Sequence, residues 1–87
     1  MKIKKGFILR NVANENVVMP IGQASVVLNG IIKLNASGAL LWNALMEGAE
    51  KADLAGLLQQ EYGISAEMAS ADVDAFIATL TSAGCLE

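Results

Sequence analysis

Few side chains in this sequence could carry out acid–base, nucleophilic or metal chemistry. The chain has no histidine and one cysteine, Cys85. General bases at neutral pH are usually histidines or carboxylates with a raised pKa, and the candidate carboxylate pair is Asp72 and Asp74. Residues two apart on a helix point to different faces, so we expect both carboxylates to be solvated charges.

The remaining candidate sites are also unpromising. Cys85 stands between Gly84 and Leu86 without a histidine to activate it, so we expect it to be a small packing residue. A Cys/His zinc site cannot be assembled from these residues, and the glycines are scattered rather than gathered in a phosphate-binding loop. The sequence therefore predicts that the protein is not an enzyme and has no catalytic residue, metal site or cofactor.

The N-terminal third predicts a small antiparallel sheet of three to four strands. Residues 13–16 read as a turn, and Pro20 is expected to end the second strand because proline has no N–H to donate. The pair Asn29–Gly30 between apolar runs is typical of a hairpin turn. The expected strands are residues 7–12, 17–19, 25–28 and 31–34.

The rest of the chain predicts three helices. Asn35 and Ser65 are expected to be N-caps of the first and third helices, and the second is expected over Lys51–Tyr62. Their apolar faces would be Leu41, Trp42, Leu45 and Met46; Leu54, Leu57 and Leu58; and Ala69, Val73, Phe76, Ile77 and Leu80. We assign Trp42 to the core. Strands followed by helices predict an α+β fold, here one small winged helix-turn-helix-like domain covering residues 1–87.

Charge and hydropathy disfavour two classes of partner. The third helix of a winged helix-turn-helix would read DNA, but residues 66–83 contain three acidic residues and no Lys or Arg. DNA affinity comes largely from cationic side chains, so nucleic acid is not expected. No apolar run approaches the roughly 20 residues that span a bilayer, and none near the N-terminus has the length of a signal-peptide core. A cytoplasmic protein without a membrane partner is expected.

Protein or peptide binding remains. A short sheet has an edge strand whose free N–H and C=O groups can pair with an extended peptide, unless that edge is covered. Residues 1–35 carry five basic side chains and one acidic side chain, whereas residues 36–87 carry one basic and eight acidic side chains. The basic half favours a partner with acidic residues beside its strand, and binding should then weaken with salt.

One segment carries a resemblance to a known family. Residues 34–42, Leu-Asn-Ala-Ser-Gly-Ala-Leu-Leu-Trp, resemble the Leu-Asn-x-x-Gly/Ala-x-x-x-Trp motif of the PqqD-like family. Members are small proteins of pyrroloquinoline quinone biosynthesis and related ribosomal-peptide modification systems. Residues 7–10 and 17–20 are similar to the first two strands of the family, and residues 54–63 and 72–86 to its last two helices. The resemblance covers nearly the whole chain.

The resemblance implies a peptide chaperone that binds the leader of a precursor peptide by β-strand addition and presents it to a radical SAM maturase. In the family, the leader pairs with the sheet edge beside the last helix. Carried over to this sequence, the peptide-binding residues are Ile31, Ile32, Lys33 and Leu34 of the accepting strand and Asp72, Ala75, Phe76 and Thr79 of the last helix. Phe76 is also compatible with a place in the core.

Two other functions stay open at this point. The chain could be an obligate interaction or dimerisation subunit of a maturase complex that uses the same apolar edge. A DNA-binding winged-helix regulator is the least favoured, because of the acidic third helix. Both a monomer and a homodimer are compatible with the sequence.

Overall fold

The computed structural model describes residues 1–21 and 32–87, and these form a three-stranded antiparallel sheet followed by three helices. The predicted α+β order is confirmed. The elements are β1 (Phe7–Val12), β2 (Glu15–Pro20), β3 (Ile32–Leu34), α1 (Ala36–Glu47), α2 (Lys51–Tyr62) and α3 (Ala66–Ala83). The strand predicted at residues 25–28 and the turn predicted at Asn29–Gly30 lie outside the described residues.

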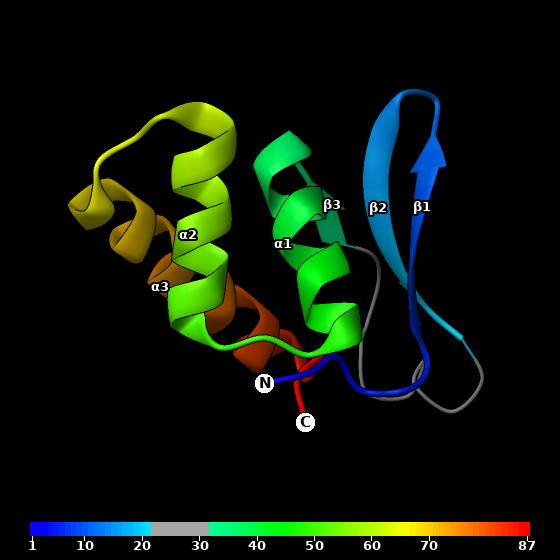
Figure 1. Cartoon of the computed structure of the whole chain (residues 1–87). Coiled ribbons are helices and arrows are strands. Elements are labelled where there is room, and N and C mark those ends of the chain that lie inside the picture. The colour runs from blue at the N-terminus through cyan, green and yellow to red at the C-terminus, as the bar shows by residue number, and fades with distance from the viewer. Residues whose placement is uncertain (22–31) are drawn as a thin grey trace.

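The sheet has the order β1-β2-β3, with β3 on the side of α1 and the β1–β2 hairpin reaching away from the helices (Figure 1). Ala13 and Asn14 both have positive φ, 51° and 66°, and make a two-residue turn. The predicted four-residue turn is therefore too long. Because a tight turn with two positive φ values matches the twist of the strands, Glu15 and Asn16 pair with β1 instead of looping out.

The core lies between the sheet and the three helices. Trp42 and Leu45 of α1 are 1% and 0% exposed, and they belong to one core cluster with the buried residues of α2 and α3. Most residues of the predicted apolar faces are buried, with three exceptions. Met46 is 44% exposed, because only one stripe of α1 faces the core, and Leu57 and Phe76 are half-buried.

Each helix begins and ends at a recognisable signal. The predicted caps are confirmed: Asn35 Oδ1 accepts from the Gly38 N–H at 2.8 Å, and Ser65 Oγ accepts from the Met68 N–H at 3.1 Å. The α2 helix lacks a Ser or Thr cap, but the Glu50 N–H donates to Asp53 Oδ2 at 2.9 Å. None of the described helices is long and apolar enough to cross a membrane.

The two ends of the chain pack against each other beneath the helices. Ile3 is 5% exposed and forms a β-bridge with Leu86, and the Lys4 N–H donates to the Cys85 carbonyl at 2.8 Å. This places Cys85 in the core at 0% exposure, as predicted for a packing residue. Burial raises the pKa of the Cys85 thiol, and the nearby Lys4 charge offsets part of that rise.

The raised pKa of Cys85 predicts a loss of stability at alkaline pH. Below the unfolded-state thiol pKa of about 8.5, both states hold the proton and the contribution is fully present. Above it the unfolded chain releases the proton first, so stability falls until pH passes the folded-state pKa, by at most about 1.4 kcal/mol per pH unit. Urea unfolding across this range should show a steeper decline for the natural protein than for Cys85→Ala; equal slopes would contradict the prediction.

Candidate functional site

The hairpin turn fixes which backbone groups of β2 point in which direction. A two-residue turn of this kind is flanked by a pair of residues that bond each other through both N–H and C=O, here Val12 and Glu15. Such pairs recur at every second position, and the bond of 2.7 Å from the Ile21 N–H to the Gly6 carbonyl falls in the same phase. Odd-numbered residues of β2 therefore bond to β1, and even-numbered residues turn their backbone groups toward β3.

The same phase assigns the free backbone groups of β3. Ile32 and Leu34 lie opposite even-numbered residues of β2, whereas Lys33 lies opposite Val17. Ile32 and Leu34 therefore bond to β2, and Lys33 directs its N–H and C=O to the outer side of the strand. Within the described residues, β2 is the one strand that pairs with β3.

The side chains of β3 are divided between the two faces of the sheet. Ile32 and Leu34 are half-buried and pack against the core. Lys33 is exposed, and its Nζ lies 3.3 Å from Glu15 Oε2 in a pair that is open to solvent on both sides. The strand thus offers a backbone donor and acceptor on its outer side while its apolar side chains hold it to the domain.

The four predicted residues of α3 lie together in one hollow. Asp72, Ala75, Phe76 and Thr79 line a hollow of ≈ 310 Å³ whose other wall is the first part of α1. Phe76 packs against the core and also lines this hollow. The Thr79 hydroxyl donates to the Ala75 carbonyl at 3.1 Å within its own helix.

The α1 wall of this hollow is built around Asn35. Its Oδ1 accepts from the Gly38 N–H at 2.8 Å and from the Ser37 hydroxyl at 2.9 Å. A Cβ at Gly38 would lie 3.2 Å from Asn35 Oδ1 and 3.3 Å from Leu34 Cβ, closer than ordinary contacts. Glycine at this position therefore lets α1 approach the end of β3 closely, and the Leu-Asn-x-x-Gly motif has a structural reason.

Two further hollows meet the first at Asn35. One lies beside the end of β3 and is lined by Lys33, Leu34 and the first residues of β2. The other, of ≈ 390 Å³, lies between the start of α1 and the end of α2 and is lined by Leu58, Tyr62 and Ile64. Tyr62 and Ile64 were not predicted as site residues; the available signal was an aromatic side chain at the end of a predicted helix.

The predicted site residues are thus brought to one side of the molecule but not into one hollow. Lys33 and Leu34 line the hollow beside β3, the α3 residues line the neighbouring one, and Asn35 borders both. Ile32 lines none of these hollows. Ile31 lies outside the described residues.

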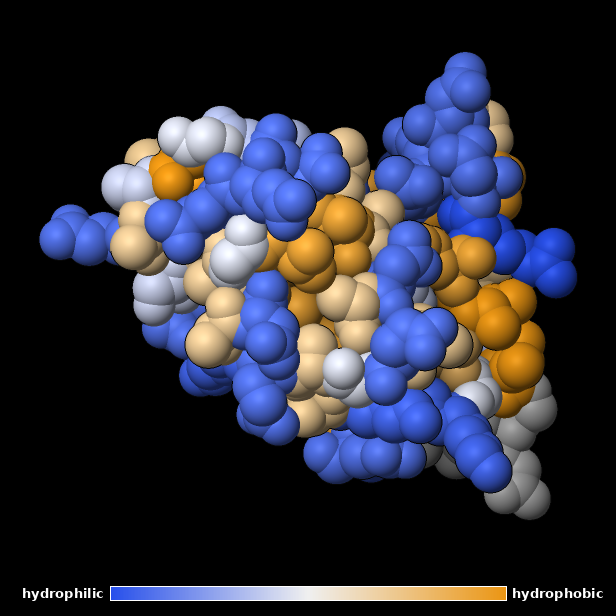
Figure 2. All heavy atoms as spheres, in the orientation of Figure 1, coloured by the Kyte–Doolittle hydropathy of each residue, from blue (hydrophilic) through white to orange (hydrophobic). Residues whose placement is uncertain are grey.

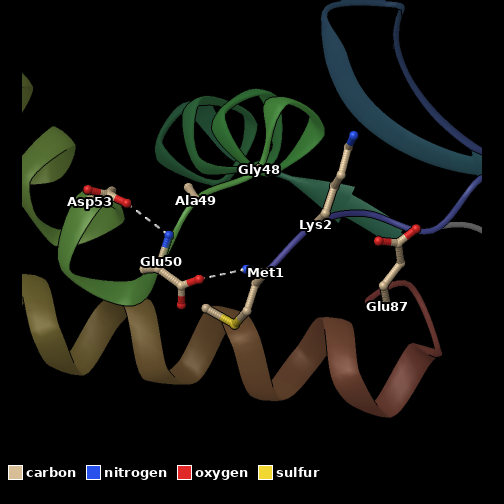
Figure 3. Close-up of a pocket in the computed structure, with 7 residues that line it drawn as sticks. All are labelled: Met1, Lys2, Gly48, Ala49, Glu50, Asp53 and Glu87. Atoms are coloured by element: carbon tan, nitrogen blue, oxygen red, sulfur yellow. Dashed lines mark hydrogen bonds and ion pairs between the residues drawn. The ribbon is translucent and has the colours of Figure 1, made fainter.

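A separate hollow lies where the N-terminus meets the α1–α2 connection (Figure 3). There the Met1 ammonium donates to Glu50 Oε1 at 3.2 Å, and Asp53 accepts from the Glu50 backbone. In Figure 3, Met1, Glu50 and Asp53 form this ion pair and the start of α2, whereas the side chains of Lys2 and Glu87 take no part in either interaction. Across residues 1–21 and 32–87, no group of three or more Cys, Asp or Glu side chains is placed to hold a metal ion.

Comparisons with known proteins agree with this architecture. The family model described as coenzyme PQQ synthesis protein D (PqqD) matches residues 15–86. TbiB1 in complex with the TbiA(beta) leader peptide has a TM-score of 0.80 and 22% identity, covering 100% of this chain and 95% of that one. Lasso peptide synthetase B1 complexed with a leader peptide has a TM-score of 0.76 and 23% identity, covering 97% and 93%. These two likenesses show a shared fold.

Comparison with curated protein sequences gives no match. The family assignment therefore depends on the family model, which spans β2, β3 and all three helices. This region includes the Asn35 cap, the close approach at Gly38 and the buried Trp42, which together form the motif of residues 34–42. The chain belongs to the PqqD family.

Proposed function

We propose that this protein binds the leader of a ribosomally made precursor peptide and presents it to a radical SAM maturase without catalysing a reaction itself. The leader adds as a strand to the outer side of β3. The observation that carries the proposal is the outward N–H and C=O of Lys33, on a strand with one described partner. Lys33 lines the hollow that meets the hollow of α3 at Asn35. An extended peptide pairs with such an edge through its main chain.

Several further observations support this proposal. The family to which the chain belongs and the two structural relatives, both in complex with leader peptides, favour the same kind of ligand. We assign the peptide contacts to Ile31, Ile32, Lys33 and Leu34 on the strand and to Asp72, Ala75, Phe76 and Thr79 on α3. We further propose that residues 1–87 act as a single recognition domain in the cytoplasm.

The same edge supports a second candidate, a dimerisation or interaction subunit of a maturase complex. A strand edge without a partner among the described residues is also a template for pairing with a second copy of the chain or with another protein. Light scattering distinguishes the two candidates. A dimer that persists on dilution and refuses peptide supports the second candidate, whereas a monomer that binds peptide one-to-one supports the first.

Calorimetric titration tests the proposed function. The probe is a synthetic leader peptide, chosen by searching the genes next to this one for a short precursor peptide. We expect one-to-one binding with a dissociation constant below about 100 μM, or about −5.5 kcal/mol. If the protein is folded and the titration shows no heat of binding with this leader at about 100 μM, the proposal is contradicted.

A further inference from the structure

The hollow between α1 and α2 is apolar and open. Leu58 lies at its base with 2% exposure, and Tyr62 on its rim is 48% exposed. The space-filling view shows apolar surface between the helices on this face of the molecule (Figure 2). Exposed apolar surface gathered in a hollow, rather than scattered singly, is typical of a binding surface.

This hollow is continuous with the proposed peptide site. It shares Asn35, Ser37, Leu58 and Asp72 with the hollow of α3, and Asn35 also borders the hollow at the end of β3. A peptide that pairs with Lys33 and continues past Leu34 therefore reaches it. The occupant that follows from this continuity is the same leader peptide, beyond its paired strand.

Asp72 gives the combined surface a negative charge. It is the single charged residue among the described residues that line the two helical hollows, and it makes no ion pair within them. Its helix neighbour Asp74 is paired with Lys51 at 3.1 Å, and Lys33 is paired with Glu15.

Lys2 is too far away to reverse this charge. Lys2 lines the hollow at the opposite end of α1, and a helix of 12 residues is about 18 Å long. That length exceeds the Debye length of about 8–10 Å at physiological salt, so the charge of Lys2 is screened at Asp72. The local charge therefore favours a basic residue in the peptide, in contrast to the acidic flank expected from the composition of the sheet half.

We propose that Asp72 selects leader peptides in which a lysine or arginine lies next to an apolar side chain that enters the hollow of Leu58, Tyr62 and Ile64. The inference depends on the proposed function, because it names the substrate class of that same site. The apolar side chain packs onto Leu58 and covers the exposed ring of Tyr62, and the cation pairs with the Asp72 carboxylate at the rim. The edge of β3 binds the main chain of the peptide, whereas Asp72 and the hollow of Leu58, Tyr62 and Ile64 bind its side chains.

Asp72 could alternatively serve the fold. The first turn of α1 has no acidic residue, and Asp72 lines a hollow with Asn35 and Ser37, so its charge could stabilise the positive end of that helix. The two roles separate cleanly. A role in the fold alone predicts that Asp72→Asn lowers the midpoint of urea unfolding and leaves peptide preference unchanged.

Selection from a random-peptide phage library tests the proposal. We expect the natural protein to enrich peptides with Lys or Arg beside a large apolar residue, and Asp72→Lys to enrich Asp or Glu at that place. Asp74→Lys is the matched control, because it makes the same charge change on α3 outside both hollows and should select as the natural protein does. Tyr62→Ala should lose the apolar preference while keeping the basic one.

Affinities then quantify the selection. For a selected peptide, Asp72→Asn should weaken binding about two- to fivefold, as for an exposed ion pair, and less at high salt. A peptide with Glu in place of its basic residue should bind Asp72→Lys more tightly than the natural protein. Identical selections by the natural protein and Asp72→Lys would overturn this inference alone, whereas a natural protein that enriches no peptide would contradict the proposed function itself.

Discussion

Replacing Lys33 with proline should weaken leader binding by roughly 5- to 150-fold, while Lys33→Ala should leave it nearly unchanged. Proline removes the outward N–H, and the loss of a buried hydrogen-bond partner costs about 1–3 kcal/mol. Both variants lose the Lys33 side chain and its solvent-exposed pair with Glu15, which contributes at most about 1 kcal/mol. The difference between them in calorimetric titration isolates the backbone donor.

The fold should tolerate proline at Lys33 because no bond between β2 and β3 uses that N–H. Ile32→Pro is the informative counterpart. It removes an N–H that bonds to β2, so it should lower the thermal midpoint of the protein, whereas Lys33→Pro should shift it much less. Equal peptide affinities of Lys33→Pro and Lys33→Ala would show that the main chain of Lys33 does not hold the peptide.

Replacing Trp42 with alanine should lower the free energy of unfolding by about 3–5 kcal/mol. The indole is 1% exposed and lies in the main core cluster, so its removal opens a cavity among residues from the sheet and the helices. Small domains have only about 5–15 kcal/mol of stability in total. The variant should therefore unfold at much lower urea concentration, and a substantial fraction could be unfolded without denaturant.

Met46 supplies the matched control for Trp42. It lies on the same helix but is 44% exposed, so Met46→Ala should cost less than about 1 kcal/mol. Circular dichroism is the appropriate signal, because Trp42 is the single tryptophan of the chain and its replacement removes the tryptophan fluorescence that would otherwise report unfolding. A Trp42→Ala variant that unfolds within 1 kcal/mol of the natural protein would contradict the assignment of this residue to the core.

The helices could be predicted from the sequence because their signals are local. Asn35 and Ser65 satisfy N–H groups within their own first turns, and Gly63 and Gly84 take left-handed conformations that few other residues adopt. These interactions involve neighbours in sequence. The order of elements and most of the core followed from the same local patterns.

Other features depend on contacts between distant residues, and these were missed. Ile3 stands alone among lysines and shows no periodicity, yet it is buried through its bridge to Leu86. Met46 fits the helical spacing, but spacing does not state how wide a buried stripe is. The predicted turn at residues 13–16 is two residues too long, because Ala13 is not a typical residue for positive φ.

The candidate site shows the same division. The four α3 residues were implied by the resemblance to the PqqD-like family, and in the structure they line one hollow. That Lys33 rather than Ile32 carries the outward backbone groups follows only from the register of β2 and β3. Tyr62 and Ile64 join the site through the packing of α2 against α1 and α3, which no local pattern encodes.

Amide hydrogen exchange at Lys33 tests the central claim most directly. In the free protein, NMR should show slow exchange for the Ile32 and Leu34 amides, which bond to β2, and faster exchange for Lys33. Saturation with the leader peptide should protect the Lys33 amide strongly, since its N–H then bonds to the added strand. A leader that binds and perturbs α3 while the Lys33 amide exchanges as fast as before would contradict strand addition at β3.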